Sequence, residues 1–135
     1  MPIFEVHLVA GRHPPERLAE LLRALSARYA EILESPVERV RGFVTAHPAA
    51  HVVAGGEVGV EAPYVTALVL RGRPVEQRHR LIAAFTDVVV DVLGAARASV
   101  RVRIEQVDPD EWGIAGVPAS AARATEIAAR AAGSG

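Results

Sequence analysis

Residues 64–85, YVTALVLRGRPVEQRHRLIAAF, contain the sequence pattern that decides the fold. The segment opens with an almost unbroken apolar run, Tyr64 to Leu70, which is typical of a strand buried within a sheet. Gly72 and Arg73 follow, and then a proline close to where the apolar spacing of a helix begins. The segment therefore predicts a buried strand, a short connection and a helix.

The same order occurs about 60 residues earlier in the chain. Gly11-Arg12 recurs as Gly72-Arg73, and Val40-Arg41 recurs as Val100-Arg101. Each copy reads as an apolar strand, a Gly-Arg pair, an amphipathic helix and a second strand. The sequence therefore predicts two tandem β-α-β units.

Hydrophobic spacing supports this order in both copies. Phe4, Val6 and Leu8 alternate with polar residues, as do Val100, Val102 and Ile104, and this period of two is typical of strands. The helices show apolar residues at intervals of three and four, which form one face. These residues are Leu18, Leu21, Leu22, Leu25, Tyr29, Ile32 and Leu33 in the first copy, and Leu81, Ile82, Phe85, Val88, Val89, Val92 and Leu93 in the second.

We therefore expect an α+β fold in one domain spanning residues 1–135. The units, about 2–50 and 64–117, would share a four-stranded mixed sheet with both helices on one face. A connector at 51–63 is expected to form a hairpin, and the alanine-rich tail at 118–135 a helix. Little sequence remains to cover the other face of the sheet, which favours a homo-oligomer.

Composition excludes several classes of function. The net charge of −1 implies neither a nucleic acid nor an anionic membrane as partner. No apolar stretch reaches the roughly 20 residues of a membrane span, so a cytoplasmic protein is expected. The absence of cysteine excludes disulfides and thiolate catalysis. His47 and His51 are four residues apart, but Pro48 interrupts a helix there, so neither a metal site nor a cofactor is expected.

Six short motifs, three in each half, carry a resemblance to a known family. They are Pro2-Ile3, HLVAGR (7–12) and SPVERVRGFVT (35–45) in the first half, and LVLRGRPVEQR (68–78), ASVRVRIEQV (98–107) and EWGIAG (111–116) in the second. Together they resemble the tautomerase superfamily, whose founding type is 4-oxalocrotonate tautomerase. Members consist of β-α-β units, as short subunits or as fused pairs. The resemblance covers residues 2–117 and implies a homotrimer for a fused pair.

The resemblance implies that Pro2 is catalytic once Met1 is removed. A proline at the true amino terminus is a secondary amine, which acts as a base when it is not protonated. An ordinary α-amino group has a pKa of roughly 7.7–8, and that of proline is intrinsically higher. Burial and nearby arginines both lower the pKa of such an amine toward neutral pH.

Arginines are the expected substrate-binding groups. Arg71 and Arg73 would lie on the same side if the strand continued past them, and guanidinium groups bind carboxylates with two hydrogen bonds. The resemblance implies that Arg73 binds the substrate carboxylate or polarises its carbonyl, and that Arg71 matches a second arginine of the malonate semialdehyde decarboxylase branch. Arg12, the repeat counterpart of Arg73, faces no free proline and is expected to be structural.

Four further residues match family positions. Either Arg41 or Arg101 would enter the site of a neighbouring subunit, and Trp112 would form an apolar wall of the pocket. Glu38 lies one residue from the position of the decarboxylase aspartate and is a possible acid; a solvated loop is its other interpretation. Ile114 stands where branches that activate water carry a glutamate, which disfavours hydration.

Three functions remain open at this point. The leading hypothesis is a tautomerase of 2-hydroxydienoate or enolpyruvate-type acids, with Pro2 as general base and the arginines stabilising the enolate. The second is a decarboxylase of a small 3-oxo acid, such as malonate semialdehyde, with protonated Pro2 polarising the carbonyl. The third is an oligomeric family member without activity.

Overall fold

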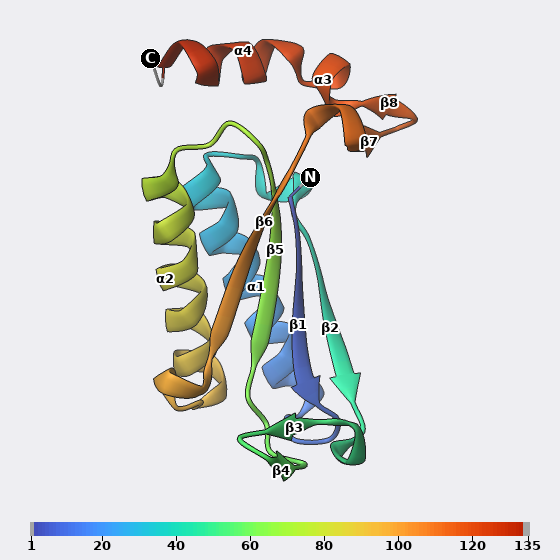
Figure 1. Ribbon diagram of the computed structural model, residues 1–135, viewed down its shortest axis with the longest axis vertical. Coiled ribbons are helices and arrows are strands. Elements are labelled where there is room, and N and C mark those ends of the chain that lie inside the picture. The colour runs from blue at the N-terminus through green and yellow to red at the C-terminus, as the bar shows by residue number, and fades with distance from the viewer. Residues whose placement is uncertain (1, 134–135) are drawn as a thin grey trace.

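The computed structural model describes residues 2–133 and arranges them as a sheet with two long helices against one face (Figure 1). The sheet contains β1 (Ile3–Val9), β2 (Arg41–His47), β5 (Tyr64–Leu70) and β6 (Arg101–Val107) in the order β2-β1-β5-β6. The pairs β1–β2 and β5–β6 are parallel, and the central pair β1–β5 is antiparallel. This confirms the predicted α+β fold. Met1, whose removal the catalytic hypothesis requires, lies outside the described residues.

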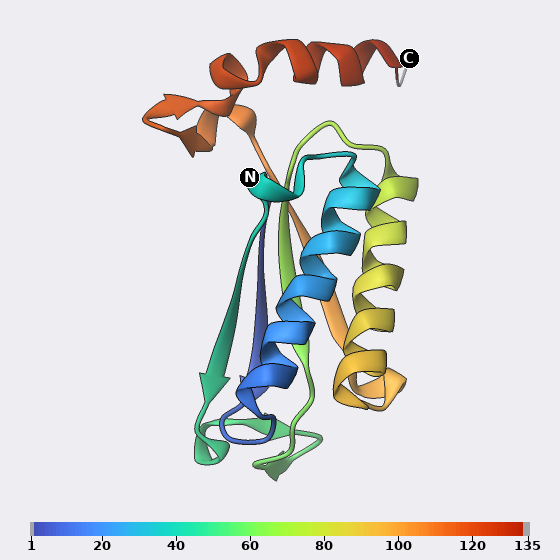
Figure 2. The ribbon, with the colours of Figure 1, turned by 180° about the vertical axis from the view of Figure 1, so that it is seen from behind.

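The helices α1 (Pro15–Leu33) and α2 (Val75–Leu93) cross from the first to the second strand of each unit. Figure 2 shows both of them in front of the sheet. They run in opposite directions, so the end of α1 and the start of α2 lie at the same end of the molecule. Each helix is preceded by a proline, Pro14 or Pro74, and α1 also begins with Pro15, whose fixed φ suits the first helical position.

Short elements fill the connections. The connector contains the hairpin β3–β4, and the C-terminal segment crosses the molecule where α1 ends and α2 begins (Figure 1). The bounds are β3 (Val53–Ala54), β4 (Glu57–Val58), β7 (Gly113–Ile114), β8 (Val117–Pro118), α3 (Ala119–Ala122) and α4 (Ala124–Gly133), with single 3₁₀ turns η1 (Val37–Arg39), η2 (Ala49–His51), η3 (Arg97–Ser99) and η4 (Pro109–Glu111).

The two units repeat each other down to single hydrogen bonds. The amide of Arg41 donates to the carbonyl of Pro2 at 3.0 Å, and the amide of Arg101 donates to the carbonyl of Pro63 at 3.0 Å. Pro2 and Pro63 are therefore equivalent positions, each fixed at the start of an inner strand by the neighbouring outer strand. Pro63 is an internal residue that is bonded to Ala62 through an amide, so it has no free amino group.

Three aromatic rings form the centre of the core between sheet and helices. Phe4 lies 6.1 Å from Tyr29 and 5.8 Å from Phe85, and Tyr29 and Phe85 meet edge-on at 5.2 Å between ring centroids. The buried hydroxyl of Tyr29 donates to the carbonyl of Leu68, so its polar atom has a partner. Burial also raises the pKa of Tyr29, which keeps the phenol neutral.

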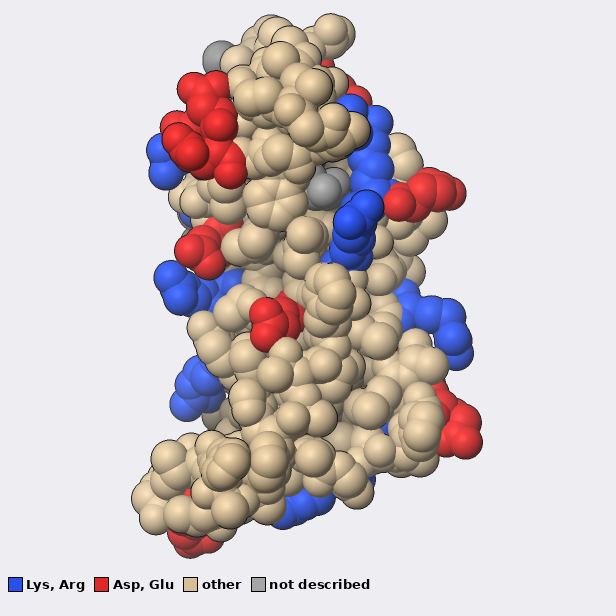
Figure 3. Space-filling view, turned by 90° about the vertical axis from the view of Figure 1, so that its right-hand side faces the viewer, with Lys and Arg blue, Asp and Glu red and all other residues tan. Residues whose placement is uncertain are grey.

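The opposite face of the sheet carries no helix and is partly apolar. Phe43 on β2 is 55% exposed there. Figure 3 views the molecule from the side of Figure 1 on which β2 lies; most charged side chains there lie toward the margins, and the middle is mainly uncharged apart from an acidic group. Within residues 2–133, no helix is long and apolar enough to cross a membrane. A cytoplasmic location stays a prediction.

Phe4 fits the core only because its cross-strand partner is glycine. Gly42 lies opposite Phe4 on β2, and a Cβ added to Gly42 would overlap the Phe4 ring. In the second unit the equivalent cross-strand pair is Val65 and Val102. In one unit a phenylalanine therefore lies opposite a glycine, which has no side chain, whereas in the other unit two valines of intermediate size lie opposite each other.

We predict that Gly42→Ala lowers the free energy of unfolding by about 1–3 kcal/mol, because the added methyl group displaces a ring packed on two others. Urea denaturation measures this loss. Gly113→Ala is the matched control, since a Cβ at Gly113 has no atom within 4 Å. Equal midpoints for Gly42→Ala and the unsubstituted protein would show that the Phe4 ring can move without cost.

Candidate active site

Pro2 lies buried at the edge of a small cavity between the sheet and the C-terminal segment. Its carbonyl group belongs to the hydrogen-bond ladder between β1 and β2, so the ladder fixes the residue in place. The cavity has a volume of about 20 Å³, which is room for one water molecule. Leu70 at the end of β5, Arg73 and Arg123 are among its lining residues.

A turn after β5 places Arg73 in this cavity. The strand ends at Leu70, and Gly72 adopts a φ of +115°, a conformation that side chains with a Cβ rarely adopt. The Arg73 side chain is 9% exposed. It donates to the carbonyl of Leu33 at 2.8 Å and lies 3.3 Å from Oε1 of Gln77. These contacts hold one nitrogen of the guanidinium against the end of α1.

Arg73 remains a cation at neutral pH. Burial, followed by repulsion from Arg130, lowers its pKa to about 10. Among residues 2–133, no carboxylate lies within ion-pair distance of the Arg73 guanidinium. A buried guanidinium with no carboxylate of its own is suited to bind an anionic ligand.

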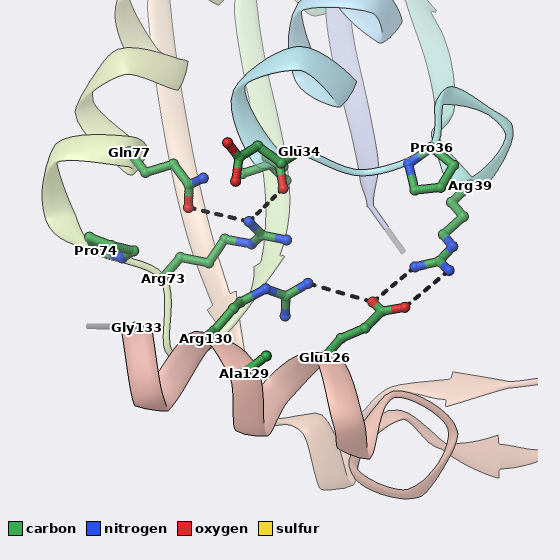
Figure 4. Close-up of a pocket in the computed structure, with 11 residues that line it drawn as sticks. Glu34, Pro36, Arg39, Arg73, Pro74, Gln77, Glu126, Ala129, Arg130 and Gly133 are labelled. Carbon is green, nitrogen blue, oxygen red and sulfur yellow. Dashed lines mark hydrogen bonds and ion pairs between the residues drawn. The ribbon is translucent and has the colours of Figure 1, made fainter. Parts of the chain in front are cut away.

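A second arginine of the cavity is already paired. Arg39 in η1 donates two hydrogen bonds to the carboxylate of Glu126 on α4, at 3.0 and 3.1 Å. Arg130, one helical turn beyond Glu126, lies 3.8 Å from the same carboxylate. Figure 4 shows Glu126 between the two arginines, with Arg73 entering from the other side. The hydrogen bonds from Arg39 lower the pKa of Glu126, so it is ionised at neutral pH.

The small cavity continues into a larger one of about 540 Å³ between the body of the molecule and α4. The larger cavity also contains Glu34, Pro74 and Gln77 among its lining residues (Figure 4). The larger space has the volume of a small organic acid, and it adjoins the cavity beside Pro2. The residues that line both cavities are Leu33, Arg39, Arg73, Glu126 and Arg130.

The other predicted site residues lie elsewhere. Because β5 ends at Leu70, Arg71 does not share the side of Arg73; it is exposed, and its amide donates to the carbonyl of Val107 at 2.8 Å. Glu38 is exposed on η1. Arg101 is exposed and donates to the carbonyl of Ala98 at 2.7 Å. The Pro2 cavity is not lined by Glu38, Arg71 or Arg101.

Arg41 and Trp112 lie together in a separate cavity. Both line a space of about 180 Å³ that also contacts Ile3 and the β7–β8 hairpin. Since Pro2 and Ile3 are consecutive, the two cavities flank the start of β1. Within one chain, Trp112 is therefore not a wall of the Pro2 cavity.

The equivalent region of the other unit has the opposite charge. Arg12, the counterpart of Arg73, is exposed and donates to the carbonyl of Gly59 at 2.6 Å. Beside the end of β1, Glu61 accepts hydrogen bonds from the amide of Val9 at 2.9 Å and from the ring of His13 at 2.6 Å. A half-buried carboxylate in this place disfavours a carboxylate ligand, in contrast to the cavity beside Pro2, which four arginines line.

Sequence reasoning missed four charged residues among those that line the cavity: Arg39, Arg123, Glu126 and Arg130. A partial signal was available in the tail. Residues 123, 126 and 130 are separated by three and four positions, which places them on one helix face. The pairing of Glu126 with Arg39 joins residues that are 87 positions apart, and no local sequence pattern indicates such a contact.

Comparison with known proteins finds a family whose sequence model matches both units. Residues 2–61 and 63–122 each match the sequence model described as Tautomerase enzyme. A probable tautomerase of Ralstonia nicotianae is 44% identical over 61 residues, which are 45% of this chain and 87% of that protein. The 2-hydroxymuconate tautomerase of Comamonas testosteroni is 42% identical over 57 residues, 42% of this chain and 90% of that protein.

A solved structure matches both units at once. It is described as a fused 4-OT wild-type symmetric trimer, is 33% identical, and superposes with a TM-score of 0.83 over 89% of this chain and 98% of its own. The first two relatives correspond to about one unit of this chain, whereas the solved structure corresponds to two. The end of the tail, which includes α4, lies beyond the residues that match the family model.

Proposed function

Since this chain belongs to the tautomerase enzyme family, we propose that it interconverts the enol and keto forms of small carboxylic acids with the amino group of Pro2 as general base. The observation that carries the proposal is that Pro2 and Arg73 line one cavity, although they are 71 positions apart in the sequence. The proposal requires removal of Met1, because only a free amine accepts a proton.

The reaction needs a base and a cation at opposite ends of the substrate. Pro2 takes the proton of the enol hydroxyl, the O–H electrons form the carbonyl, the double bond shifts, and the same amine returns a proton to carbon. The guanidinium of Arg73 binds the carboxylate and stabilises the negative charge of the enolate between the two steps. No redox partner is required, since substrate and product are isomers.

The cations around Pro2 favour its role as a base. Arg39, Arg73, Arg123 and Arg130 all line its cavity, against the single carboxylate of Glu126. Excess positive charge disfavours protonation of an amine, as does burial. Both effects increase the fraction of neutral amine at physiological pH.

The decarboxylase hypothesis is less well supported. It relied on Arg71 and Arg73 together, with Glu38 as a possible acid, and of these only Arg73 lines the cavity of Pro2. Assays of a monocarboxylic enol (phenylenolpyruvate), a dicarboxylic enol (2-hydroxymuconate) and malonate semialdehyde, side by side, separate the two reactions. The inactive-oligomer hypothesis predicts turnover of none of them.

Assembly as a homotrimer is part of the proposal. The uncovered sheet face and its exposed Phe43 support it, as does the trimeric relative of fused units. In such a trimer, Arg41 and Trp112 of one protomer would complete the site of a neighbour.

We predict that Pro2→Ala lowers kcat for tautomerisation by about 10²–10⁴-fold, the usual contribution of a general base. Some activity is expected to remain, because alanine still offers a primary amine. Pro63→Ala is the matched control, since Pro63 holds the equivalent place without a free amine; circular dichroism verifies that both variants fold. Mass spectrometry of the amino terminus completes the test, and an active enzyme that retains Met1 would refute the role of Pro2.

We predict that Arg73→Ala loses more kcat/KM than Arg12→Ala, by about 1.5–3 kcal/mol of transition-state stabilisation. Both side chains donate to a backbone carbonyl, but only Arg73 is buried beside Pro2. The pH profile gives a second readout. Activity rises as the Pro2 ammonium loses its proton, and removing a neighbouring cation stabilises that ammonium, so this limb moves to higher pH in Arg73→Ala. Equal losses in the two variants would place the site elsewhere.

Light scattering at micromolar concentration is expected to give a mass three times that of the 14.3 kDa chain. Phe43→Glu should lower this mass, because it places a charge on the uncovered face of the sheet. A monomeric mass for the unsubstituted protein would contradict the trimer.

A further inference from the structure

The carboxylate of Glu126 binds the guanidinium of Arg39 in the way that a substrate carboxylate would. Both oxygens of Glu126 accept hydrogen bonds from the two terminal nitrogens of Arg39, at 3.0 and 3.1 Å. This bidentate arrangement is how guanidinium groups recognise carboxylate ligands. The carboxylate comes from α4, which lies outside the residues that match the family model.

The two arginines of the cavity therefore differ in availability. Arg73 has no carboxylate within ion-pair distance among the described residues, whereas Arg39 has one from within the chain. Both arginines line the small cavity beside Pro2 and the larger one that adjoins it. An acid with one carboxylate can bind Arg73 directly. An acid with two must displace Glu126 before its second carboxylate reaches Arg39.

We propose that Arg39 is a second carboxylate-binding subsite of the Pro2 cavity, and that Glu126 is a specificity-determining residue that occupies it and thereby disfavours dicarboxylic substrates. The proposal rests on the proposed function, because it names the substrate class that the same cavity selects. It assigns to α4 a chemical role in addition to covering Pro2.

The pair is accessible enough to exchange. The Arg39 and Glu126 side chains are 31% and 41% exposed, and an ion pair at such exposure is stabilised only weakly. Two further cations, Arg123 and Arg130, lie near Glu126 and keep it ionised. When Glu126 leaves Arg39, it still has Arg130 on its own helix as a partner.

The test compares two unreactive acids that share a six-carbon chain, hexanoate with one carboxylate and adipate with two. Dissociation constants are measured by calorimetry for the unsubstituted protein and for Glu126→Gln, which keeps the shape and removes the charge. Binding of adipate is expected to tighten about tenfold, because its second carboxylate gains Arg39 without competition, while that of hexanoate changes less than twofold. The preference in kcat/KM should shift in the same direction, from phenylenolpyruvate toward 2-hydroxymuconate.

Glu34→Gln is the matched control. Glu34 lines the larger cavity and carries the same charge, but it has no ion pair with Arg39. It is expected to change the binding of both acids by the same small factor, through general electrostatics alone. Circular dichroism verifies the fold of both variants.

Three results would overturn the inference. The first is that Glu126→Gln binds adipate and hexanoate more tightly by the same factor, which would mean that α4 only covers the cavity. The second is the same selectivity for adipate in Glu34→Gln, and the third is no binding of adipate to Glu126→Gln. The proposed function is tested separately by turnover. Selective tightening of adipate without tautomerase activity would support the subsite and refute the reaction, and activity without selective tightening would do the reverse.

Discussion

The antiparallel pairing of β1 with β5 is the constraint on which both the fold and the candidate site depend. It joins two β-α-β units into one sheet, and the register Ile3 to Leu68 places the start of β1 beside the end of β5. Pro2 directly precedes β1, and Arg73 follows β5. A parallel pairing would have put these residues at opposite ends of the sheet. The cavity therefore arises from strand direction before any side chain is considered.

The same pairing creates an equivalent place at the other end, and side chains make the two ends unlike. Pro63 is amide-bonded to Ala62, Arg12 is exposed, and the carboxylate of Glu61 lies beside the end of β1. The core shows a related difference, with Phe4 against Gly42 in one unit and Val65 against Val102 in the other. Two units with the same backbone plan therefore differ in their side chains, and in the proposed reaction only Pro2 supplies an amine.

Apart from histidine, arginine supplies all the basic side chains of the chain, which contains no lysine. This choice matters most in the cavity, where burial lowers the pKa of Arg73 only to about 10 and leaves it charged. The planar guanidinium also explains the fit between Arg39 and Glu126, because its two terminal nitrogens match two carboxylate oxygens. Because the chain contains no lysine, no side chain supplies a primary amine, and the proposed amine chemistry depends on Pro2.

The amino-acid sequence by itself determined the two units, their helices and strands, and the pairing of Pro2 with Arg73 as candidate site residues. Apolar periodicity is enough to predict the helices and strands because it is a local property of the sequence. The repeat then predicts each strand and each helix a second time. Only the tertiary structure decided which charged groups share the cavity. Arg71 and Arg73 separate because the strand ends at Leu70, and Arg39 meets Glu126 because α4 crosses the end of the molecule. Such contacts depend on where a chain turns and what then packs against it, which residue spacing does not encode.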